Sequence, residues 1–325
     1  MTSTLTRGPL PDETVAEVMA LATNTTAHDG VPPLSEAPLL ALRYGSKDAL
    51  HLLERRVDRV VAYAQLDLGT SRAELVVAPE VRRQGIGRSM TEALLRESSS
   101  PLLMWAHGDL PCSRAFAEAL GATRRRELLH MSTGGEGVAG GEGLSRGGVG
   151  DRPDAPIVAK RAVQERCQGS STARFVRIGG KSPWEVGGFV EGKDEEAWVG
   201  VNAAAFVGHP EQGRMTREDL VRRMSEPWFD PDGLLAAREP GGGDLRGYVW
   251  TKVVGEVGEI YAIGVHPSAQ GVGLGRALLT AGLEHLVGRG VRQVELYVEA
   301  EQERAVRMYA QAGFVIVGRD VQYGW

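Results

Sequence analysis

Cysteine is scarce in this chain, and its scarcity narrows the chemistry open to it. Only two cysteines occur among 325 residues, Cys112 and Cys167, and no Cys-x-x-Cys spacing is present. A disulfide framework or a thiolate metal site needs more cysteines, or closer ones. The seven histidines are scattered, and no pair has the helical spacing of metal ligands with a carboxylate nearby. We therefore expect neither a structural disulfide nor a bound metal.

The chain also lacks long apolar runs and an excess of positive charge. No uninterrupted apolar stretch approaches the roughly 18 residues that a membrane span requires, and the polar residues 1–4 lack the apolar core of a signal peptide. The formal net charge is −5, so no general basic field attracts nucleic acid or an anionic membrane surface. These absences predict a soluble cytoplasmic protein that binds neither nucleic acid nor membranes.

Glycine, in contrast, is abundant, and it recurs in a pattern that occurs twice. Val-Ala-Pro at 77–79 is followed after five residues by Gly-Ile-Gly at 85–87, and Val-His-Pro at 265–267 is followed after five residues by Gly-Leu-Gly at 273–275. Each copy ends an apolar run and begins an amphipathic one, which predicts a strand, a glycine-rich turn and a helix N-terminus. A lone Gly-x-Gly is weak evidence for a ligand site, but two copies in one register are seldom accidental.

Such a turn favours the binding of phosphate. The first N–H groups of a helix have no acceptor within the helix and lie at the positive end of its dipole. Arg82, Arg83 and Arg88 surround the first turn, and Gln270 and Arg276 flank the second. These side chains add donors suited to a pyrophosphate. We therefore predict a phosphate-binding turn in each half of the chain.

A glycine-rich segment separates the two halves. Nine of the seventeen residues from 134 to 150 are glycine, and such a stretch cannot offset the entropy lost on ordering. We predict domains at 1–133 and 173–325, joined by a linker at 134–172 that includes one helix at 157–168. Both halves then show the same order: two strands, the turn with its helix, a strand, and a helix that ends in glycine. The second half adds a last strand at 314–317. The order predicts two copies of one α/β domain.

The order of these motifs resembles the GNAT family of acetyl-CoA-dependent N-acetyltransferases. In the second half, residues 270–275 form Gln-Gly-Val-Gly-Leu-Gly, and a later helix carries Ala305 and Tyr309 before Gly313-Phe314. The resemblance covers most of the chain and is greatest to the tandem, mycothiol-forming members, which acetylate the cysteinyl amine of a cysteinyl-glucosaminyl-inositol. The stretches that carry it are 25–31, 105–108, 202–213, 228–234, 250–252 and 296–299.

The resemblance implies a fold, a cofactor and a kind of substrate. The fold would be α/β, of the mixed α+β kind: two tandem GNAT domains, each a mixed, mostly antiparallel twisted sheet flanked by helices. Acetyl-CoA would be the acetyl donor and a small-molecule amine the acceptor. We also expect the protein to be a monomer.

The resemblance further implies which residues hold acetyl-CoA. In the second half, the backbone of 263–265 would pair with the pantetheine arm where two strands splay apart, and the turn would bind the pyrophosphate. The residues concerned are Ile263, Gly264, Val265, Gln270, Gly271, Val272, Gly273, Leu274, Gly275, Arg276, Gln302, Glu303, Arg304, Ala305, Val306 and Arg307. In the first half they are Leu75, Val76, Val77, Arg83, Gln84, Gly85, Ile86, Gly87 and Arg88. The chain departs from the family where the last helix begins, because Gln302 replaces the usual asparagine and is a poorer N-cap.

By the same resemblance, five residues would bind the acceptor substrate: Glu36, Glu211, Lys252, Glu259 and Tyr297. A sugar–inositol ligand exposes many hydroxyl groups and one ammonium group, so carboxylates, a lysine and an aromatic edge suit it, as they suit other polyol amines. Each residue also has a purely structural explanation, as a solvated surface charge, part of a turn, or an aromatic side chain that covers the sheet. The prolines around Glu36 predict a loop.

Acetyl transfer from a thioester to an amine needs a base for the amine and an acid for the departing thiolate. A cysteinyl α-amine has a pKa of about 8, so a glutamate can remove its one extra proton, through water. A thiol has a pKa of about 8.5, within range of a tyrosine hydroxyl that acts as the acid. We predict Glu259 as the base and Tyr309 as the acid, although a solvated strand carboxylate and a half-buried helix aromatic remain alternatives.

The two halves differ at these positions. Four residues before Gly313 lies Tyr309, whereas four before Gly121 lies Ala117. Eight residues before the proline that follows the strand lies Glu259 in the second half and Ser71 in the first. The first half therefore keeps the phosphate turn without the two catalytic groups, and we predict that it binds cofactor without acetylating a substrate.

Glu74 is an alternative base for the first half. Alignment of the two turns places Glu74 opposite Ala262, three residues from Glu259. Strand alternation puts residues three apart on opposite faces of a sheet, which disfavours Glu74.

Other functions stay open at this point. A GNAT enzyme that acetylates another amine, such as an aminoglycoside or a protein N-terminus, fits the same motifs. A non-catalytic acetyl-CoA sensor fits the first half. A dinucleotide dehydrogenase is disfavoured, because neither turn has the full Gly-x-Gly-x-x-Gly with an acidic residue at the usual distance.

Overall fold

The computed structural model describes residues 2–133, 174–178, 182–209 and 212–325. The predicted linker at 134–172 with its helix, and the predicted substrate residue Glu211, lie outside these residues. The described residues form two compact units. Unit 1 comprises Met1–Leu129, Glu299–Glu301 and Gly318–Trp325, and unit 2 comprises His130–Val298 and Gln302–Val317. The domain boundaries at 133 and 173 stay predictions.

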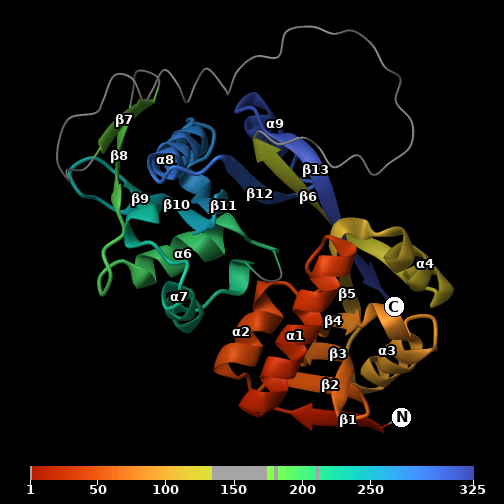
Figure 1. The fold of residues 1–325 in the computed structure, drawn as a ribbon. Helices are drawn as coiled ribbons and strands as arrows, with labels where there is room; N and C mark the ends of the chain where they lie inside the picture. Colours follow the sequence, from red (N-terminus) through yellow and green to blue (C-terminus); the bar gives the residue numbers. More distant parts are fainter. Residues whose placement is uncertain (1, 134–173, 179–181, 210–211) are drawn as a thin grey trace, which may run out of the picture. The chain divides into compact units, whose positions relative to one another are not determined.

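Unit 1 is a mixed sheet flanked by helices (Figure 1). Its elements are β1 (Thr2–Arg7), α1 (Asp12–Asp29), α2 (Glu36–Tyr44), β2 (Ala49–Arg56), β3 (Arg59–Asp67), β4 (Arg72–Val77), α3 (Ile86–Glu97), β5 (Leu103–Ala106), α4 (Pro111–Ala119), the first part of β6 (Thr123–Thr133) and the end of β13 (Val315–Gly324). Strands β1 to β5 lie side by side in chain order, and residues 321–324 of β13 pair with β5. The β4–β5 pair is parallel, and the pairs from β1 to β4 are antiparallel.

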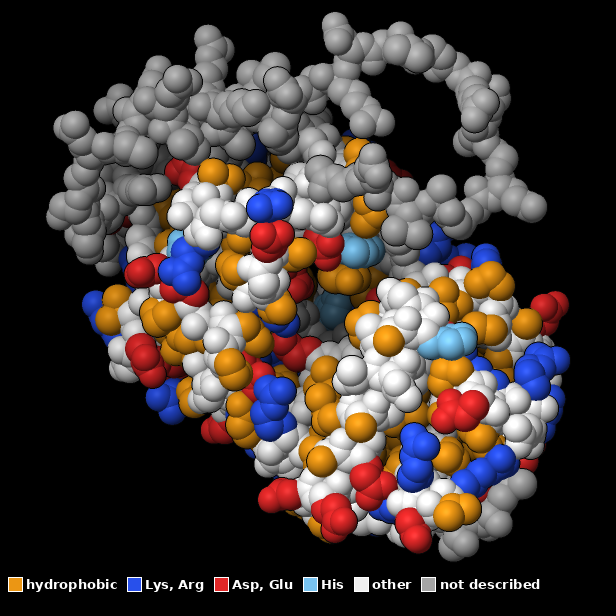
Figure 2. Space-filling model, in the orientation of Figure 1, with side chains coloured by type: hydrophobic (Ala, Val, Ile, Leu, Met, Phe, Trp, Pro, Cys, Tyr) orange, Lys and Arg blue, Asp and Glu red, His pale blue; other side chains and the backbone are white. Residues whose placement is uncertain are grey.

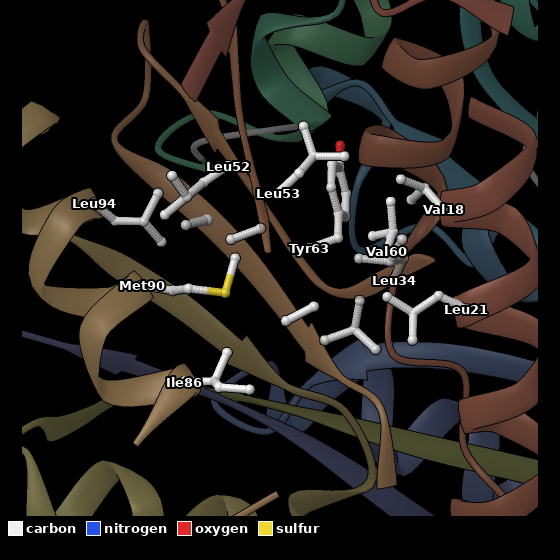
Figure 3. Close-up of a cluster of buried hydrophobic side chains, with 14 of the residues drawn as sticks. Val18, Leu21, Leu34, Leu52, Leu53, Val60, Tyr63, Ile86, Met90 and Leu94 are labelled. Atoms are coloured by element: carbon white, nitrogen blue, oxygen red, sulfur yellow. The ribbon is translucent and has the colours of Figure 1, made fainter. Parts of the chain in front are cut away.

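The core of unit 1 lies on both faces of its central strands. Figure 3 shows Val18 and Leu21 of α1 on one side of the sheet, and Met90 and Leu94 of α3 on the other. Tyr63 of β3 is fully buried with them. Burying a leucine or methionine side chain of this size stabilises the fold by roughly 1.5–3 kcal/mol, so the two helices are held against the sheet by several such contacts.

Unit 2 also contains strands that pair in both directions. Its elements are β7 (Arg174–Ile178), β8 (Ser182–Gly188), α6 (Glu195–Ala205), α7 (Arg217–Met224), β9 (Leu234–Arg238), β10 (Leu245–Val254), β11 (Val257–Val265), α8 (Leu274–Gly288), β12 (Gln293–Glu299) and α9 (Glu303–Gln311). The strand order is β7-β8-β9-β10-β11-β12, and the end of β6 follows β12. Strands β7 to β11 pair antiparallel, and β11 pairs parallel with β12. Helix α8 packs on one face of β10 and β11, and α6 packs on the other (Figure 1).

The core beneath α6 is aromatic. Trp198 of α6 and Tyr248 and Trp250 of β10 are fully buried, and the ring centroids of Trp198 and Tyr248 lie 4.8 Å apart. The hydroxyl of Tyr248 donates a hydrogen bond of 2.6 Å to Asn202 Oδ1, which satisfies both buried groups. The same ring explains Gly264 of β11, because a Cβ at that position would lie 2.4 Å from it.

The predicted elements on either side of both glycine turns are present, with ends that differ by a few residues. The last strand is the exception, because it was expected to end at residue 317 and continues to Gly324. Its middle is polar, which hides the strand in the sequence. Asp320 nevertheless has partners, since its carboxylate accepts from the Gly108 N–H at 2.7 Å and lies 3.1 Å from His107 Nδ1.

No helix in the described ranges is both long and apolar enough to cross a bilayer. On the face shown in Figure 2, acidic and basic side chains of the described residues are interspersed, and no broad surface of one charge is visible.

Candidate active site

The two glycine turns have nearly the same backbone. The residue before the helix is Gly85 in unit 1, with φ 85°, and Gly273 in unit 2, with φ 83°. This left-handed conformation is open to glycine at little cost and costs other residues roughly 1–2 kcal/mol. The first hydrogen bonds within the helices are donated by Ser89 N to Gly85 O and by Ala277 N to Gly273 O. The amides of residues 86–88 and 274–276 precede these bonds, as an anion site requires.

One position of the turn differs between the units. Gly271 of unit 2 has φ 79°, and the matching Arg83 of unit 1 keeps a left-handed φ of 63°. An arginine in this conformation is strained by roughly 1–2 kcal/mol, whereas a glycine is not. Unit 1 therefore retains the shape of the turn although its sequence no longer favours it.

Both parallel strand pairs separate just before the turn. In unit 2 the β11–β12 pairing covers only residues 257–259 with 293–295, and in unit 1 the β4–β5 pairing covers only residues 72–73 with 103–104. Beyond these residues the strands form a fork. The predicted cofactor residues 263–265 and 75–77 therefore have backbone groups along the open side of each fork. Such groups need hydrogen-bond partners, which the amides of a pantetheine arm supply.

A cavity of about 460 Å³ opens at the fork of unit 1. The predicted first-half cofactor residues, apart from Gln84, line it together: Leu75, Val76, Val77, Arg83, Gly85, Ile86, Gly87 and Arg88. Residues 104–107 of the β5 end and several residues of α4, among them Phe116 and Ala117, complete the lining. The cavity thus joins the strand fork to the glycine turn within one unit.

Helix α9 of unit 2 and helix α4 of unit 1 correspond, and each contacts the start of the helix that follows the glycine turn. In unit 2, Arg276 donates a hydrogen bond of 2.9 Å to Gln311 of α9, and a Cβ at Gly275 would lie 3.7 Å from Met308 Sδ. In unit 1, Arg88 donates to Ala119 O of α4 at 3.3 Å. This correspondence places Tyr309 of α9 where unit 1 has Ala117, a residue that lines the cavity.

Tyr309 is 8% exposed, and its ring centroid lies 5.9 Å from that of Phe314. Burial raises the pKa of its hydroxyl to about 12. The side chain therefore keeps its proton at neutral pH and is able to donate it. Apolar surroundings would raise the pKa of the coenzyme A thiol as well. The difference between the pKa of the Tyr309 hydroxyl and that of the thiol would therefore become smaller.

Glu259 is the last residue of β11 before the fork opens. It pairs with Lys252 on β10 and with Glu295 on β12. Its neighbours in the chain, Gly258 and Ile260, face α8, so strand alternation turns the Glu259 side chain to the opposite face. Both ligands of a transfer reaction, a cofactor in the fork and an amine beside it, would meet at this residue.

Lys252 lies on the same face and is held by aromatic rings. Its Nζ lies 4.6 Å from the ring centroid of Trp228 and 5.3 Å from that of Tyr261. Cation–π contacts of this kind contribute about 0.5–2 kcal/mol and fix the ammonium group in place. Arg223 of α7 donates a hydrogen bond of 2.8 Å to the Tyr261 hydroxyl. This arrangement was not predictable from the sequence, because the four residues come from separate segments.

Strand alternation does not disfavour Glu74, contrary to the prediction, because β11 contains a register shift. Trp250 pairs with Ala262 but Thr251 pairs with Ile260, so Tyr261 is an extra residue, a β-bulge, in β11. A bulge reverses the alternation, which leaves Glu259 and Ala262 on one face. The β3–β4 pairing of unit 1 has no such shift. Counted in ladder pairs, the counterpart of Glu259 is Arg72 and not Ser71, and neither is a carboxylate.

Glu74 does face the α2 side of its sheet, but its oxygens are already occupied. They accept hydrogen bonds from Ser35 N at 2.6 Å and Ser35 Oγ at 2.5 Å, and His107 Nε2 lies 3.5 Å away. Burial lowers the pKa of His107, but the charges of Glu74 and Asp320 outweigh it and raise the pKa to about 10. The oxygens of Glu74 are therefore engaged within unit 1, which speaks against Glu74 as a base. Sequence reasoning missed this cluster, although residues 105–108 were among the stretches that carry the family resemblance.

The remaining predicted residues lie in three places. Gln302 precedes α9 without a side-chain capping bond, as its poor capping ability predicts, and residues 303–307 form the first turns of that helix. Tyr297 of β12 is 47% exposed. Glu36 is not in a loop, as the prolines suggested, but is the first residue of α2 in unit 1, because Ser35 begins the helix and residues 36–44 continue it. The prolines fail to break it because proline is tolerated in the first turn.

The chain is similar to known acetyltransferases. Residues 198–314 match the acetyltransferase (GNAT) family. The chain is 44% identical to a mycothiol acetyltransferase of Cellulomonas flavigena, over 98% of this chain and 87% of that protein. It is 41% identical to a mycothiol acetyltransferase of Thermomonospora curvata, over 97% of this chain and 94% of that one.

Solved structures share the fold. A tandem GNAT protein from the clavulanic acid biosynthesis pathway has a TM-score of 0.66 at 20% identity and covers 100% of this chain and 98% of its own. A GCN5-related N-acetyltransferase from Sphaerobacter thermophilus has a TM-score of 0.64 at 21% identity, with 99% and 95% covered. The predicted fold class, a mixed α/β tandem GNAT architecture, is confirmed by these likenesses.

Proposed function

The chain belongs to the mycothiol acetyltransferases of the GNAT family, and from this membership we propose how its two units divide the work. The protein is an N-acetyltransferase that uses acetyl-CoA as donor. It transfers the acetyl group to the cysteinyl amine of 1D-myo-inositol 2-(L-cysteinylamino)-2-deoxy-glucopyranoside, which gives mycothiol. In our proposal unit 2 carries out this reaction, and the protein acts as a cytoplasmic monomer.

One observation carries the assignment to unit 2. The fork between β11 and β12 begins at Glu259, and it leads to a turn whose helix amides are open to an anion. Acetyl-CoA bound with its pyrophosphate at residues 270–276 and its arm along residues 263–265 would bring its thioester toward the closed end of the fork. Glu259 lies there.

The proposed chemistry needs three proton transfers. Glu259, through a water molecule, removes a proton from the ammonium group of the acceptor, and the amine attacks the thioester carbonyl carbon. The tetrahedral intermediate then collapses, the carbon–sulfur bond breaks, and Tyr309 donates its proton to the departing thiolate. The nitrogen loses its second proton, which returns to the Tyr309 phenolate through water. The products are the acetamide and free coenzyme A.

Unit 1 is proposed to bind acetyl-CoA without using it. It has the same turn and a cavity at its fork, but Ala117 and Arg72 stand where unit 2 has Tyr309 and Glu259. The sheet face beside its fork also carries other contacts, because Ser35 donates a hydrogen bond to the carboxylate of Glu74 and His107 lies next to that carboxylate. These features support cofactor binding and speak against an acceptor site.

Product analysis tests the function. The full-length protein is incubated with acetyl-CoA, the cysteinyl pseudodisaccharide, an aminoglycoside and a peptide with a free N-terminus, and the products are identified by mass spectrometry. We expect one acetyl group on the cysteinyl amine and none on the competing amines. Acetylation of a competing amine alone would identify a different GNAT activity, and saturable acetyl-CoA binding without any product would identify a sensor.

Glu259→Gln tests the proposed base. The amide keeps the size of the side chain but cannot accept a proton, so we expect kcat to fall by roughly 10²–10⁴ with acetyl-CoA affinity unchanged. Glu256→Gln is the matched control, because Glu256 lies in the same hairpin and its ion pair with Arg292 is largely exposed. The control should turn over as the wild type does. Wild-type turnover by Glu259→Gln would exclude Glu259 as the base.

Tyr309→Phe tests the proposed acid. The phenyl ring keeps the packing against Phe314, so acetyl-CoA affinity should stay the same while kcat falls by roughly 10²–10⁴. Because the pKa of Tyr309 is about 12, it should cause no alkaline decline in the wild-type rate through pH 10. A collapse of cofactor affinity in Tyr309→Phe would instead mean that the residue is structural.

Gly87→Val tests the silent unit. A Cβ at position 87 would lie 3.2 Å from the Phe116 ring, so valine should crowd the turn of unit 1. We expect isothermal titration calorimetry to show the loss of one of two acetyl-CoA binding events, with turnover nearly unchanged. A large fall in turnover with both binding events retained would contradict the proposal for unit 1.

A further inference from the structure

A small polar cluster lies beside the proposed base in unit 2. His130, near the end of β6, places its Nε2 3.0 Å from Glu295 Oε2 on β12. The other oxygen of Glu295 accepts a hydrogen bond of 2.7 Å from Gln293. The His130 ring also stacks on Tyr297, with 4.6 Å between ring centroids and 7° between their planes. One histidine thus holds both a carboxylate and an aromatic ring.

The sheet register places this cluster next to the base. Glu295 on β12 pairs directly with Glu259 on β11, and paired residues of neighbouring strands project from the same face. Tyr297 lies two residues further along β12, so it shares that face. On the other side of Glu259 is Lys252. The polar groups form a row across β10, β11 and β12, which His130 completes on β6.

The cluster is ordered and also accessible to a ligand. The side chains of His130 and Glu295 are 24% and 23% exposed, and Tyr297 is 47% exposed. The hydrogen bond from His130 holds the pKa of the Glu295 carboxyl below its usual value, so the group remains an ionised acceptor. Groups that are held in place before a ligand arrives lose little entropy when it binds.

We propose that His130 and Glu295 join Tyr297, which is already expected at the acceptor site, in binding the polyhydroxylated part of the acceptor substrate, with His130 as the residue that positions the other two. The inference rests on the proposed function and adds residues of the acceptor site to it. A carboxylate oxygen accepts hydrogen bonds from sugar or cyclitol hydroxyl groups, and an exposed phenol adds a donor and a flat apolar surface. The amine of such a ligand would then lie near Glu259, one strand away.

Two acceptor substrates distinguish a role in binding the hydroxyl groups from a general role in catalysis. The first is the cysteinyl pseudodisaccharide, and the second is L-cysteinamide, which keeps the amine and thiol but has no hydroxyl groups. For His130→Ala and Glu295→Gln we expect the KM of the first acceptor to rise about 10-fold, with kcat and the KM of acetyl-CoA unchanged. With L-cysteinamide, both variants should match the wild type in kcat/KM.

Further variants divide the contribution of His130. His130→Phe keeps a ring to stack on Tyr297 but cannot bond Glu295, so its KM should lie between those of the wild type and His130→Ala. Arg292→Ala is the matched control, because Arg292 precedes β12 and is 79% exposed. It should leave both acceptors unaffected. Thermal unfolding of each variant identifies any loss of folding, and Glu295→Gln then decides the test if His130→Ala is unstable.

Three results would be decisive against one proposal or the other. A wild-type KM for the pseudodisaccharide in both His130→Phe and Glu295→Gln overturns the inference. Equal losses on the pseudodisaccharide and L-cysteinamide overturn it too, because the cluster would then act on the base and not on the hydroxyl groups. Failure of the wild-type protein to acetylate the pseudodisaccharide at all overturns the proposed function instead.

Discussion

The short parallel pairing of β11 with β12 is the constraint on which the arrangement of unit 2 depends. If the two strands stayed paired, their backbone groups would satisfy each other and leave no edge for a ligand. They part at Glu259, and the glycine turn before α8 lies at the far end of the same opening. The fork thus sets the direction of a bound cofactor. The same geometry recurs in unit 1 between β4 and β5.

The two units share the parts of the fold that we propose for cofactor binding and differ in the parts that we propose for chemistry. Both keep a left-handed glycine before the helix, and unit 1 keeps the turn even with a strained Arg83. Only unit 2 has the bulge at Tyr261, and that extra residue brings Glu259 and the Lys252 side chain to one face at the fork. In unit 1 the corresponding face is occupied by Glu74, Ser35 and a protonated His107. In unit 1 a hydrogen-bonded network therefore lies on the face where we propose the acceptor site of unit 2.

Much of the fold was predictable, because its strongest signals are local. The strand, turn and helix around Gly273 follow from a few adjacent residues, and so does the helix that carries Tyr309. The predicted catalytic pair came from the family resemblance and the chemistry of acetyl transfer, with the comparison of the two halves as support, and the pair stays a prediction. The bulge at Tyr261 was missed because residues 260–263 are all apolar or aromatic, so no change of alternation marks the extra residue in the sequence. The contact of His130 with Glu295 was also missed, since it joins two strands far apart in the chain and no periodicity reports it.

The end of β13 has a consequence for how the protein is made. Residues 321–324 pair with β5, and the Trp325 indole donates to Leu120 O at 3.0 Å, so the strand that covers the edge of β5 in unit 1 comes from a segment more than two hundred residues later in the chain. A ribosome releases the first 129 residues long before these last ones exist. During that interval the edge of β5 is uncovered, and an exposed strand edge can pair with other chains. Unit 1 therefore remains prone to aggregation during synthesis until residues 321–324 have been made and have paired with β5.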